Sequence, residues 1–307
     1  MSWLERALDH LSQKPISGYQ ATDTPAVEPT ALAAMALVAH GRTTAAFRAL
    51  DWLGDLQSPD GFLGIRSGQS GPHWATGWAV MAWMAGVSRR GRTNVRIATE
   101  KEPTDGARND SRWSSAAERA CHWLLTWKGE AVPRSAAFAH DTTLQGWSWV
   151  EGTHSWVEPT AINLMALKVS GYAEHPRCRE AVRLLVDRML ASGGWNYGNT
   201  AVLGTPLRSH VQPTGLALAA LAREETAARA CERAARALLE TLSPKTTPVS
   251  LGYALIGITG HAAWPPRADT WLAAAGERLL DCGAPAYGLS LLLLAARRED
   301  FLTRYFQ

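Results

Sequence analysis

The sequence predicts an all-α fold, a single (α/α)6 toroid in which six inner helices form a barrel inside a second barrel of six outer helices. The first observation is a repeat: Val-Glu-Pro-Thr-Ala occurs at 27–31 and at 157–161, and Val-Gln-Pro-Thr-Gly occurs at 211–215. The second is an alternation, along the 307-residue chain, between nearly uncharged apolar segments and amphipathic segments that carry Arg and Glu. A helix that is apolar on all sides needs burial on all sides, which an inner barrel provides.

The inner helices are predicted from the apolar segments. They begin near Glu28, His73, Glu158, Gln212, Pro248 and Pro285. In each copy of the repeat a proline stands where the first helical turn is expected, and its missing N–H costs nothing there. Apolar residues at helical spacing follow each copy, so the repeat marks the start of an inner helix.

The outer helices are predicted over 4–11, 44–56, 115–127, 177–190, 223–242 and 267–280, where apolar and charged residues alternate at helical spacing. The links from outer to inner helices repeat a glycine followed by an aromatic residue, at Gly61-Phe62, Gly146-Trp147 and Gly194-Trp195. Glycine permits a tight turn there, and the ring fills the space between neighbouring repeats. Residues 89–113 are polar and lack periodicity, so we expect an exposed insertion in one domain that covers 1–307.

Composition narrows the classes of function. The net charge of +3 is too small to indicate nucleic-acid binding. The four cysteines are scattered, which is typical of reduced thiols in a cytoplasmic protein and not of a zinc ribbon or a disulfide framework. The first residues lack the apolar run of a secretory signal, and no apolar run reaches the length of a transmembrane helix. We therefore expect a cytoplasmic protein.

These repeats resemble the terpenoid cyclase and protein prenyltransferase superfamily. The Gly–aromatic links look like degenerate forms of the QW repeats of squalene and hopene cyclases. Class II cyclases carry an Asp-x-Asp-Asp-Thr-Ala signature, whose middle aspartate protonates an alkene or an epoxide. Glu158 and Glu28 fall on that position, whereas Trp156 or Ala26 replaces the first aspartate and a proline replaces the last.

The resemblance implies an enzyme that cyclises an isoprenoid or another apolar polyene after protonation, with Glu158 as the general acid and Glu28 as its counterpart. The prenyltransferase branch binds zinc through an Asp-x-Cys pair and a histidine. Asp281-Cys282 does not have that spacing. The hypothesis therefore includes no metal and no cofactor. A structural alternative stays open for both glutamates, because a carboxylate in the first helical turn also caps free N–H groups.

Further candidates surround the predicted inner-helix starts. His154 or Asp141 would orient Glu158 or reprotonate it, and His73 and His210 would lie at the same mouth of the barrel. The alternative is that the histidines are loop residues and that Asp141 caps a turn. The residues expected to line the substrate are mostly tryptophans, of which the chain has 14. They are Trp74, Trp78, Trp147, Trp149, Trp156 and Trp195, together with His73, His210, Gln212 and Tyr197.

Ring faces in a dry cavity would stabilise a carbocation by about 2 kcal/mol each. Packing of large aromatic residues in a toroid is the alternative explanation for the tryptophans. Two other functions stay open for the whole chain. One is a non-catalytic toroid that binds a lipid, a peptide or a protein partner. The other is unrelated acid–base chemistry in the same cavity. Peripheral membrane contact and assembly with a partner chain or a second copy are further expectations.

Overall fold

The computed structural model describes residues 1–94, 105–135 and 138–299. Six helices form a closed inner ring. They are α2 (Val27–Ala39), α4 (Thr76–Asn94), α6 (Val157–Val169), α8 (Val211–Ala220), α10 (Pro248–Ile258) and α12 (Ala286–Ala296). Each packs against the next, and α12 returns to contact α2. The closed ring follows from the sequence, because every residue of α2 and α6 is buried and a helix of that kind needs neighbours on all sides.

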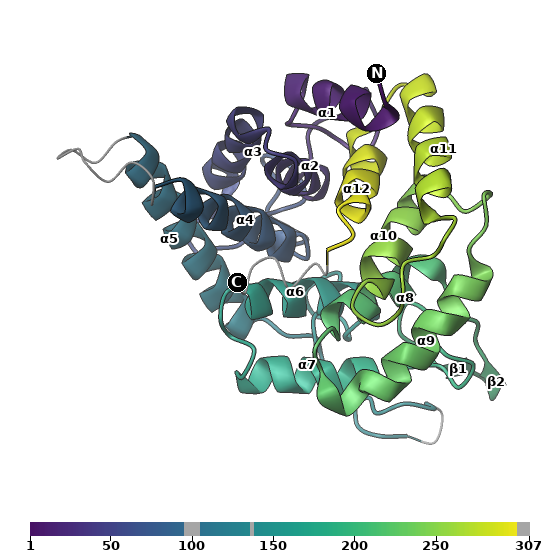
Figure 1. Cartoon of the computed structure of the whole chain (residues 1–307). Helices are drawn as coiled ribbons and strands as arrows, with labels where there is room; N and C mark the ends of the chain where they lie inside the picture. Colours follow the sequence, from purple (N-terminus) through teal and green to yellow (C-terminus); the bar gives the residue numbers. More distant parts are fainter. Residues whose placement is uncertain (95–104, 136–137, 300–307) are drawn as a thin grey trace.

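Six further helices surround this ring (Figure 1). They are α1 (Trp3–Gln13), α3 (Thr43–Leu56), α5 (Asp105–Thr126), α7 (Pro176–Asp187), α9 (Ala228–Thr241) and α11 (Ala268–Asp281). In α9 the buried residues recur at helical spacing while Arg and Glu occupy the other face. The all-α toroid predicted from the sequence is therefore confirmed, with an inner and an outer layer of helices.

A few elements lie outside the two rings. A short 3-10 helix, η1 (Glu225–Ala227), precedes α9, and a hairpin of β1 (Ala201–Val202) and β2 (Thr205–Pro206) lies in the link before α8. Of the predicted insertion at 89–113, residues 95–104 fall outside the described part. Helix α4 continues to Asn94 and α5 begins at Asp105, so both ends of the segment are helical. Trp113, at its end, is fully buried and packs against Phe47.

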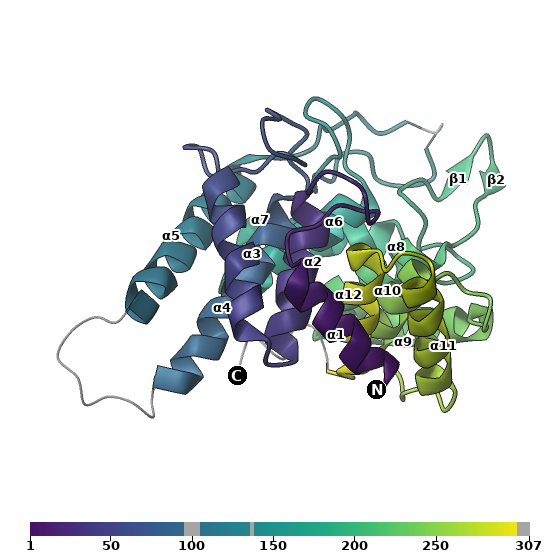
Figure 2. The same ribbon diagram turned by 90° about the horizontal axis from the view of Figure 1, so that it is seen from above.

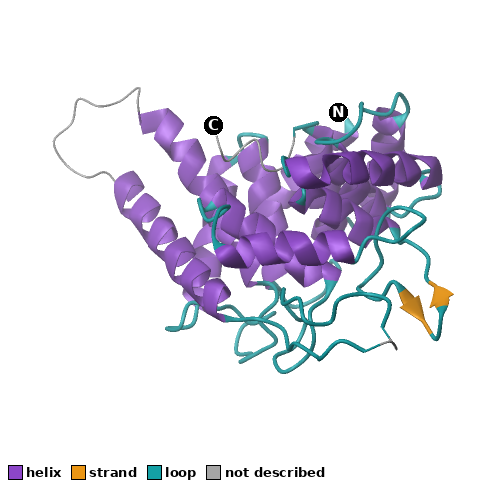
Figure 3. Ribbon diagram, turned by 90° about the horizontal axis from the view of Figure 1, so that it is seen from below, coloured by secondary structure: helices purple, strands orange, loops and turns teal. Residues whose placement is uncertain are grey.

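The long links lie at one end of the barrel. Figures 2 and 3 show the loops and the β1–β2 hairpin gathered on the same side of the helices. These links lead into the N-terminal ends of inner helices, so that end, called the mouth below, carries the repeated sequence motif. The part of the chain that the structure describes holds no helix with the length and apolarity needed to cross a bilayer.

A buried threonine fixes each motif to its link. Two residues after Glu28, Glu158 and Gln212, the threonine hydroxyl bonds both the N–H and the C=O of one residue in the preceding link, over distances of 2.9–3.4 Å. Thr76 makes the same pair of bonds, to Leu63. Trp74-Ala75-Thr76 is therefore a fourth copy of the motif, in which tryptophan takes the place of glutamate.

Candidate functional site at the mouth of the inner barrel

Glu28, in the first turn of α2, is 5% exposed and accepts hydrogen bonds from three tyrosines. Its Oε2 bonds Tyr19 Oη at 2.9 Å, and its Oε1 bonds Tyr253 Oη at 3.0 Å and Tyr287 Oη at 3.4 Å. Helix α2 has no side-chain hydrogen bond at its N-cap, Ala26. The carboxylate of Glu28 therefore binds phenols brought from a loop, α10 and α12, and the capping role that its position suggested is not seen in its bonds.

Glu158, at the equivalent position of α6, is 4% exposed. Its Oε1 has no hydrogen-bond partner among the described residues. Burial and the negative charge of Glu28 raise the pKa of Glu158 to about 7, and the nearby amide of Gln212 acts in the opposite direction. A buried carboxyl oxygen without a partner carries a free-energy cost of about 1–3 kcal/mol. Such a cost is expected where a bound molecule completes the site.

The two glutamates act on each other electrostatically. Burial raises the pKa of Glu28 to about 7 as well, and the three phenols and the indole of Trp78 lower it from a still higher value. The Trp78 N–H, although close enough to favour the anion of Glu28, completes no hydrogen bond with any described residue. The mouth thus brings together two buried carboxyls from separate repeats, with an unpaired acceptor on one and an unpaired indole donor beside the other.

Below the glutamates the barrel axis is nearly filled. A cavity of about 10 Å³ lies there, lined by apolar and aromatic residues of the inner helices, Trp78 and Tyr253 among them. A single water molecule needs about 10–15 Å³ of such space. This cavity is too small for a polyene, so we expect a substrate of the carboxyl pair to lie at the mouth.

The aromatic residues predicted at the site fall into two groups. Trp147 and Trp195 are fully buried, and their indole N–H groups bond carbonyls of outer helices, Leu124 O and Leu185 O. Both therefore fasten the links to the outer helices. Arg177 lies over the ring of Trp147, 4.5 Å from its centroid, which strengthens this packing role.

The second group lies near the inner-helix starts. Trp74 contacts Trp149 edge to face, with ring centroids 4.7 Å apart. Trp156 is half-buried at the N-cap of α6, the turn that carries Glu158. Tyr197 is 48% exposed and packs on His210, at the N-cap of α8. These residues give the mouth an aromatic rim.

The predicted partners of Glu158 have other neighbours. The Arg134 guanidinium and the Thr143 hydroxyl bind the carboxylate of Asp141 and hold its pKa well below its ordinary range. The exposed His154 lies against Trp156, and its pKa is lowered by partial burial and by Arg188. Among the described residues, Asp141 and His154 make these contacts and neither forms a hydrogen bond with Glu158.

His73 packs among Phe62, Trp123 and Trp127, with its Nε2 bonded to Ser70 O. Across the described ranges, no three histidine, cysteine or acidic side chains are grouped as they would be around a metal ion. The three predicted histidines therefore pack with separate aromatic neighbours. Of the predicted acidic residues, Glu28 affects the ionisation of Glu158 electrostatically, whereas Asp141 is bound to Arg134.

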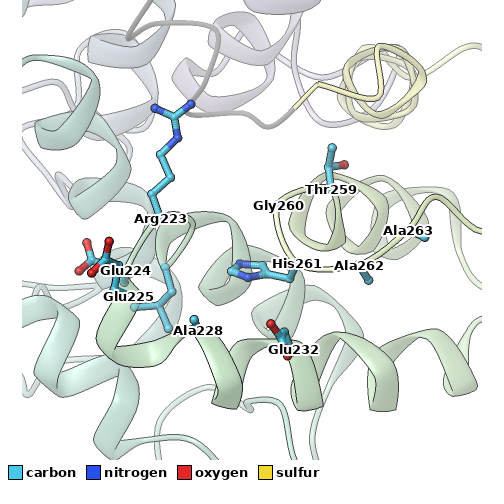
Figure 4. Close-up of a pocket in the computed structure, with 11 residues that line it drawn as sticks. Arg223, Glu224, Glu225, Ala228, Glu232, Thr259, Gly260, His261, Ala262 and Ala263 are labelled. Carbon is cyan, nitrogen blue, oxygen red and sulfur yellow. The ribbon is translucent and has the colours of Figure 1, made fainter.

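A larger pocket of about 670 Å³ lies beside α9, where α8 and α10 end. It is lined by acidic residues and by His261 (Figure 4). Glu224 is paired there with the buried Lys168, and His261 Nε2 bonds Leu218 O. Figure 4 shows Arg223 extending away from the glutamates. Glu224 and His261 are thus bonded to other residues of the protein, unlike the Oε1 atom of Glu158 at the mouth.

Two parts of this site were not predicted from the sequence. The tyrosines were not predicted as partners of Glu28, because Tyr253 and Tyr287 lie 225 and 259 residues away along the chain. The single signal available was that Tyr287 follows the start of an inner helix, as Glu28 does. The fourth copy of the motif, at Trp74, was not recognised because it lacks the proline and the acid or amide residue, although it keeps Thr76-Gly77 as the third copy keeps Thr214-Gly215.

Several solved structures are similar to this chain in their architecture. A protein from Actinoplanes aligns with 17% identity over 96% of this chain and 98% of its own, with a TM-score of 0.57. A glycosidase variant in complex with glucose aligns with 12% identity over 98% and 96%, with a TM-score of 0.59. The type II terpene cyclase MstE from Scytonema aligns with 16% identity over 91% of this chain and 78% of its own, with a TM-score of 0.51.

No protein-family model matches the chain, and no curated protein matches it by sequence. The structural matches, at these low identities, establish the fold and leave the chemistry to be argued from the site. The resemblance that the repeats indicated is confirmed at the level of the fold: the chain has a helical toroid fold that is similar to that of the type II terpene cyclase MstE and to that of the glycosidase.

Proposed function

We propose that the chain is a general acid–base enzyme whose site is the Glu28–Glu158 pair, with Glu158 as the proton donor. One observation carries the proposal: Glu158 is buried within the electrostatic influence of a second buried carboxyl, and its Oε1 has no partner in the described protein. A pKa near 7 keeps a large fraction of this carboxyl protonated around neutral pH. Such a value suits a general acid. When its pKa is close to the working pH, a large fraction of the acid is protonated and it is still strong enough to transfer the proton.

The strength of this acid favours oxygen as the proton acceptor. A carboxyl with a raised pKa is a weaker acid, and each pKa unit costs about 1.4 kcal/mol of driving force. Protonation of an alkene carbon needs a strong acid, whereas an epoxide or a glycosidic oxygen is far more basic. Trp156 and Pro159 stand where the class II signature has its flanking aspartates, so those groups are absent here. We therefore infer an oxygen-bearing substrate.

The preferred substrate class is an isoprenoid or another apolar polyene that carries an epoxide, whose ring opening would start cyclisation. The aromatic rim of Trp74, Trp149 and Trp156 supports this class, since ring faces attract the positive charge that develops. The filled axis confines such a substrate to the mouth, unless the aromatic residues around Trp78 move apart.

A glycoside is the second candidate. Paired carboxyls serve as acid and as base or nucleophile in most glycosidases. The glycosidase variant solved with glucose shares the toroid over nearly its whole length. Aromatic side chains at a mouth also suit the apolar faces of sugars. This candidate uses the same two glutamates, so the substrate alone distinguishes it from the first.

The test is incubation of the purified protein with isoprenoid epoxides and, separately, with aryl glycosides, followed by mass spectrometry of the products. Glu158→Gln removes the donor, and Glu151→Gln is a matched control at an exposed turn. A cyclised product made by the wild type and Glu151→Gln but not by Glu158→Gln supports the proposal. Release of sugar with the same dependence selects the second candidate.

Turnover that persists in Glu158→Gln contradicts the role of this residue. Saturable binding of these compounds, without product and unaffected by either substitution, would instead support a non-catalytic toroid.

A further inference from the structure

The two carboxyls of the mouth differ in their hydrogen-bond donors. Glu28 accepts from three phenols, two on Oε1 and one on Oε2. Glu158 has one oxygen without a described partner, and the amide of Gln212 is the neighbour that favours its anion. This asymmetry is built by separate elements, because Tyr19 comes from the loop before α2, Tyr253 from α10 and Tyr287 from α12.

The phenols form a connected group. Tyr253 Oη and Tyr287 Oη are 3.2 Å apart, and the ring of Tyr19 meets that of Tyr287 edge on, with centroids 5.2 Å apart. Tyr253 is 2% exposed. Packing thus fixes the direction of these hydroxyl groups toward Glu28. Hydrogen bonds from O–H groups to a carboxylate stabilise the ionised form, and a fixed donor loses no entropy in making them.

Two buried carboxyls whose charges interact, as those of Glu28 and Glu158 do, ionise one after the other. When the first becomes negative, its charge disfavours ionisation of the second. The member with more donors ionises first. We infer that Tyr19, Tyr253 and Tyr287 are positioning residues that hold Glu28 as the ionised member of the pair, so that Glu158 is the member that keeps its proton. The inference concerns the site of the proposed function, and its test needs no substrate.

The remaining groups that face the two glutamates do not all act in the same direction. The indole of Trp78, on α4, also favours the anion of Glu28. Burial and, after it, the charge of Glu28 raise the pKa of Tyr19, Tyr253 and Tyr287, so each phenol stays neutral and remains a donor. Arg66 lowers the pKa of Tyr19, although burial outweighs this effect. On Glu158, the Gln212 amide opposes the larger effects of burial and of Glu28.

The test is an NMR titration of protein labelled with ¹³C at the glutamate carboxyls. Glu28→Gln and Glu158→Gln assign the two buried signals. In the wild type, Glu28 should lose its proton at the lower apparent pKa of the pair and Glu158 at the higher. Tyr253→Phe and Tyr287→Phe should each raise the apparent pKa of Glu28 by about one unit, because each removes a donor to a charged group. In the double variant, Glu28 and Glu158 should ionise at the same apparent pKa, or Glu158 should ionise at the lower one.

Tyr197→Phe is the control, since this half-exposed rim tyrosine packs on His210. Should the buried variants fail to fold, Tyr19→Phe, at a half-buried position, provides the same measurement. The inference is overturned if Glu158 ionises first in the wild type, or if loss of the phenols leaves the Glu28 titration unchanged. The titration does not depend on turnover, so a protein with this order of ionisation but no activity would refute the proposed function alone.

Discussion

Replacement of Glu158 by Gln should stabilise the protein at alkaline pH and not at acidic pH. An ordinary glutamate has a pKa of 4.5, and that of Glu158 is raised to about 7 in the fold. Between these values the unfolded chain has released this proton while the folded chain still holds it. The free energy of unfolding therefore falls as the pH rises through this window and is constant above it. The difference corresponds to about 3 kcal/mol.

The amide of Gln has the size of the protonated carboxyl and no charge to bury. Urea unfolding at pH 4.5 and pH 8 measures the effect. Below the window the variant should match the wild type within about 1 kcal/mol, and at pH 8 it should be more stable by up to about 3 kcal/mol. Glu151→Gln, at an exposed turn, should show no such gain at pH 8. If the free energy of unfolding changed with pH in the same way in Glu158→Gln and in the wild type, Glu158 would not be a buried carboxyl with a raised pKa.

Two further predictions test how the toroid positions the site. Thr160→Val removes both hydrogen bonds to the Trp147 backbone and should cost about 2 kcal/mol in urea unfolding, whereas exposed Thr226→Val should change little; equal effects would show that the threonine does not fasten the link. Gly215→Ala should cost about 1–3 kcal/mol, because its Cβ would lie 2.3 Å from Tyr253 O, where α8 meets α10. Gly54→Ala, whose Cβ meets the flexible Arg112 side chain at 3.4 Å, should be neutral or stabilising by up to about 1 kcal/mol. A neutral Gly215→Ala would contradict the close packing of the two inner helices.

The fold could be predicted from the internal repeat together with hydrophobic patterning, because helices such as α2 and α6 carry almost no charge and need burial on every side. One apparent exception, the buried Lys168 in α6, is compensated by Glu224 and by Ala220 O. The sequence does not show this pairing, since the partners lie beyond the next inner helix start. Patterning thus predicts which segments are interior but not how their polar residues are satisfied.

The candidate site was predictable only in part. The repeat gave Glu28 and Glu158 equivalent positions, and a closed ring brings equivalent positions to the same end. The tyrosines around Glu28 could not be foreseen, because they arrive from three elements and share no motif. Asp141 was placed near Glu158 by its position along the chain, yet its loop directs the carboxylate to Arg134. The packing of the barrel axis likewise depends on side-chain volumes that a pattern of apolar residues does not specify.

The measurement that tests the central claim most directly is the pKa of Glu158 in Glu28→Gln, compared with the wild type, by ¹³C NMR titration of the glutamate carboxyls. The two carboxyls are held to lie in one site, where the charge of Glu28 raises the pKa of Glu158. Removal of that charge should therefore lower the pKa of Glu158 toward its ordinary range. An unchanged pKa of Glu158 in folded Glu28→Gln would show that the two glutamates are independent, and the paired site would have to be abandoned.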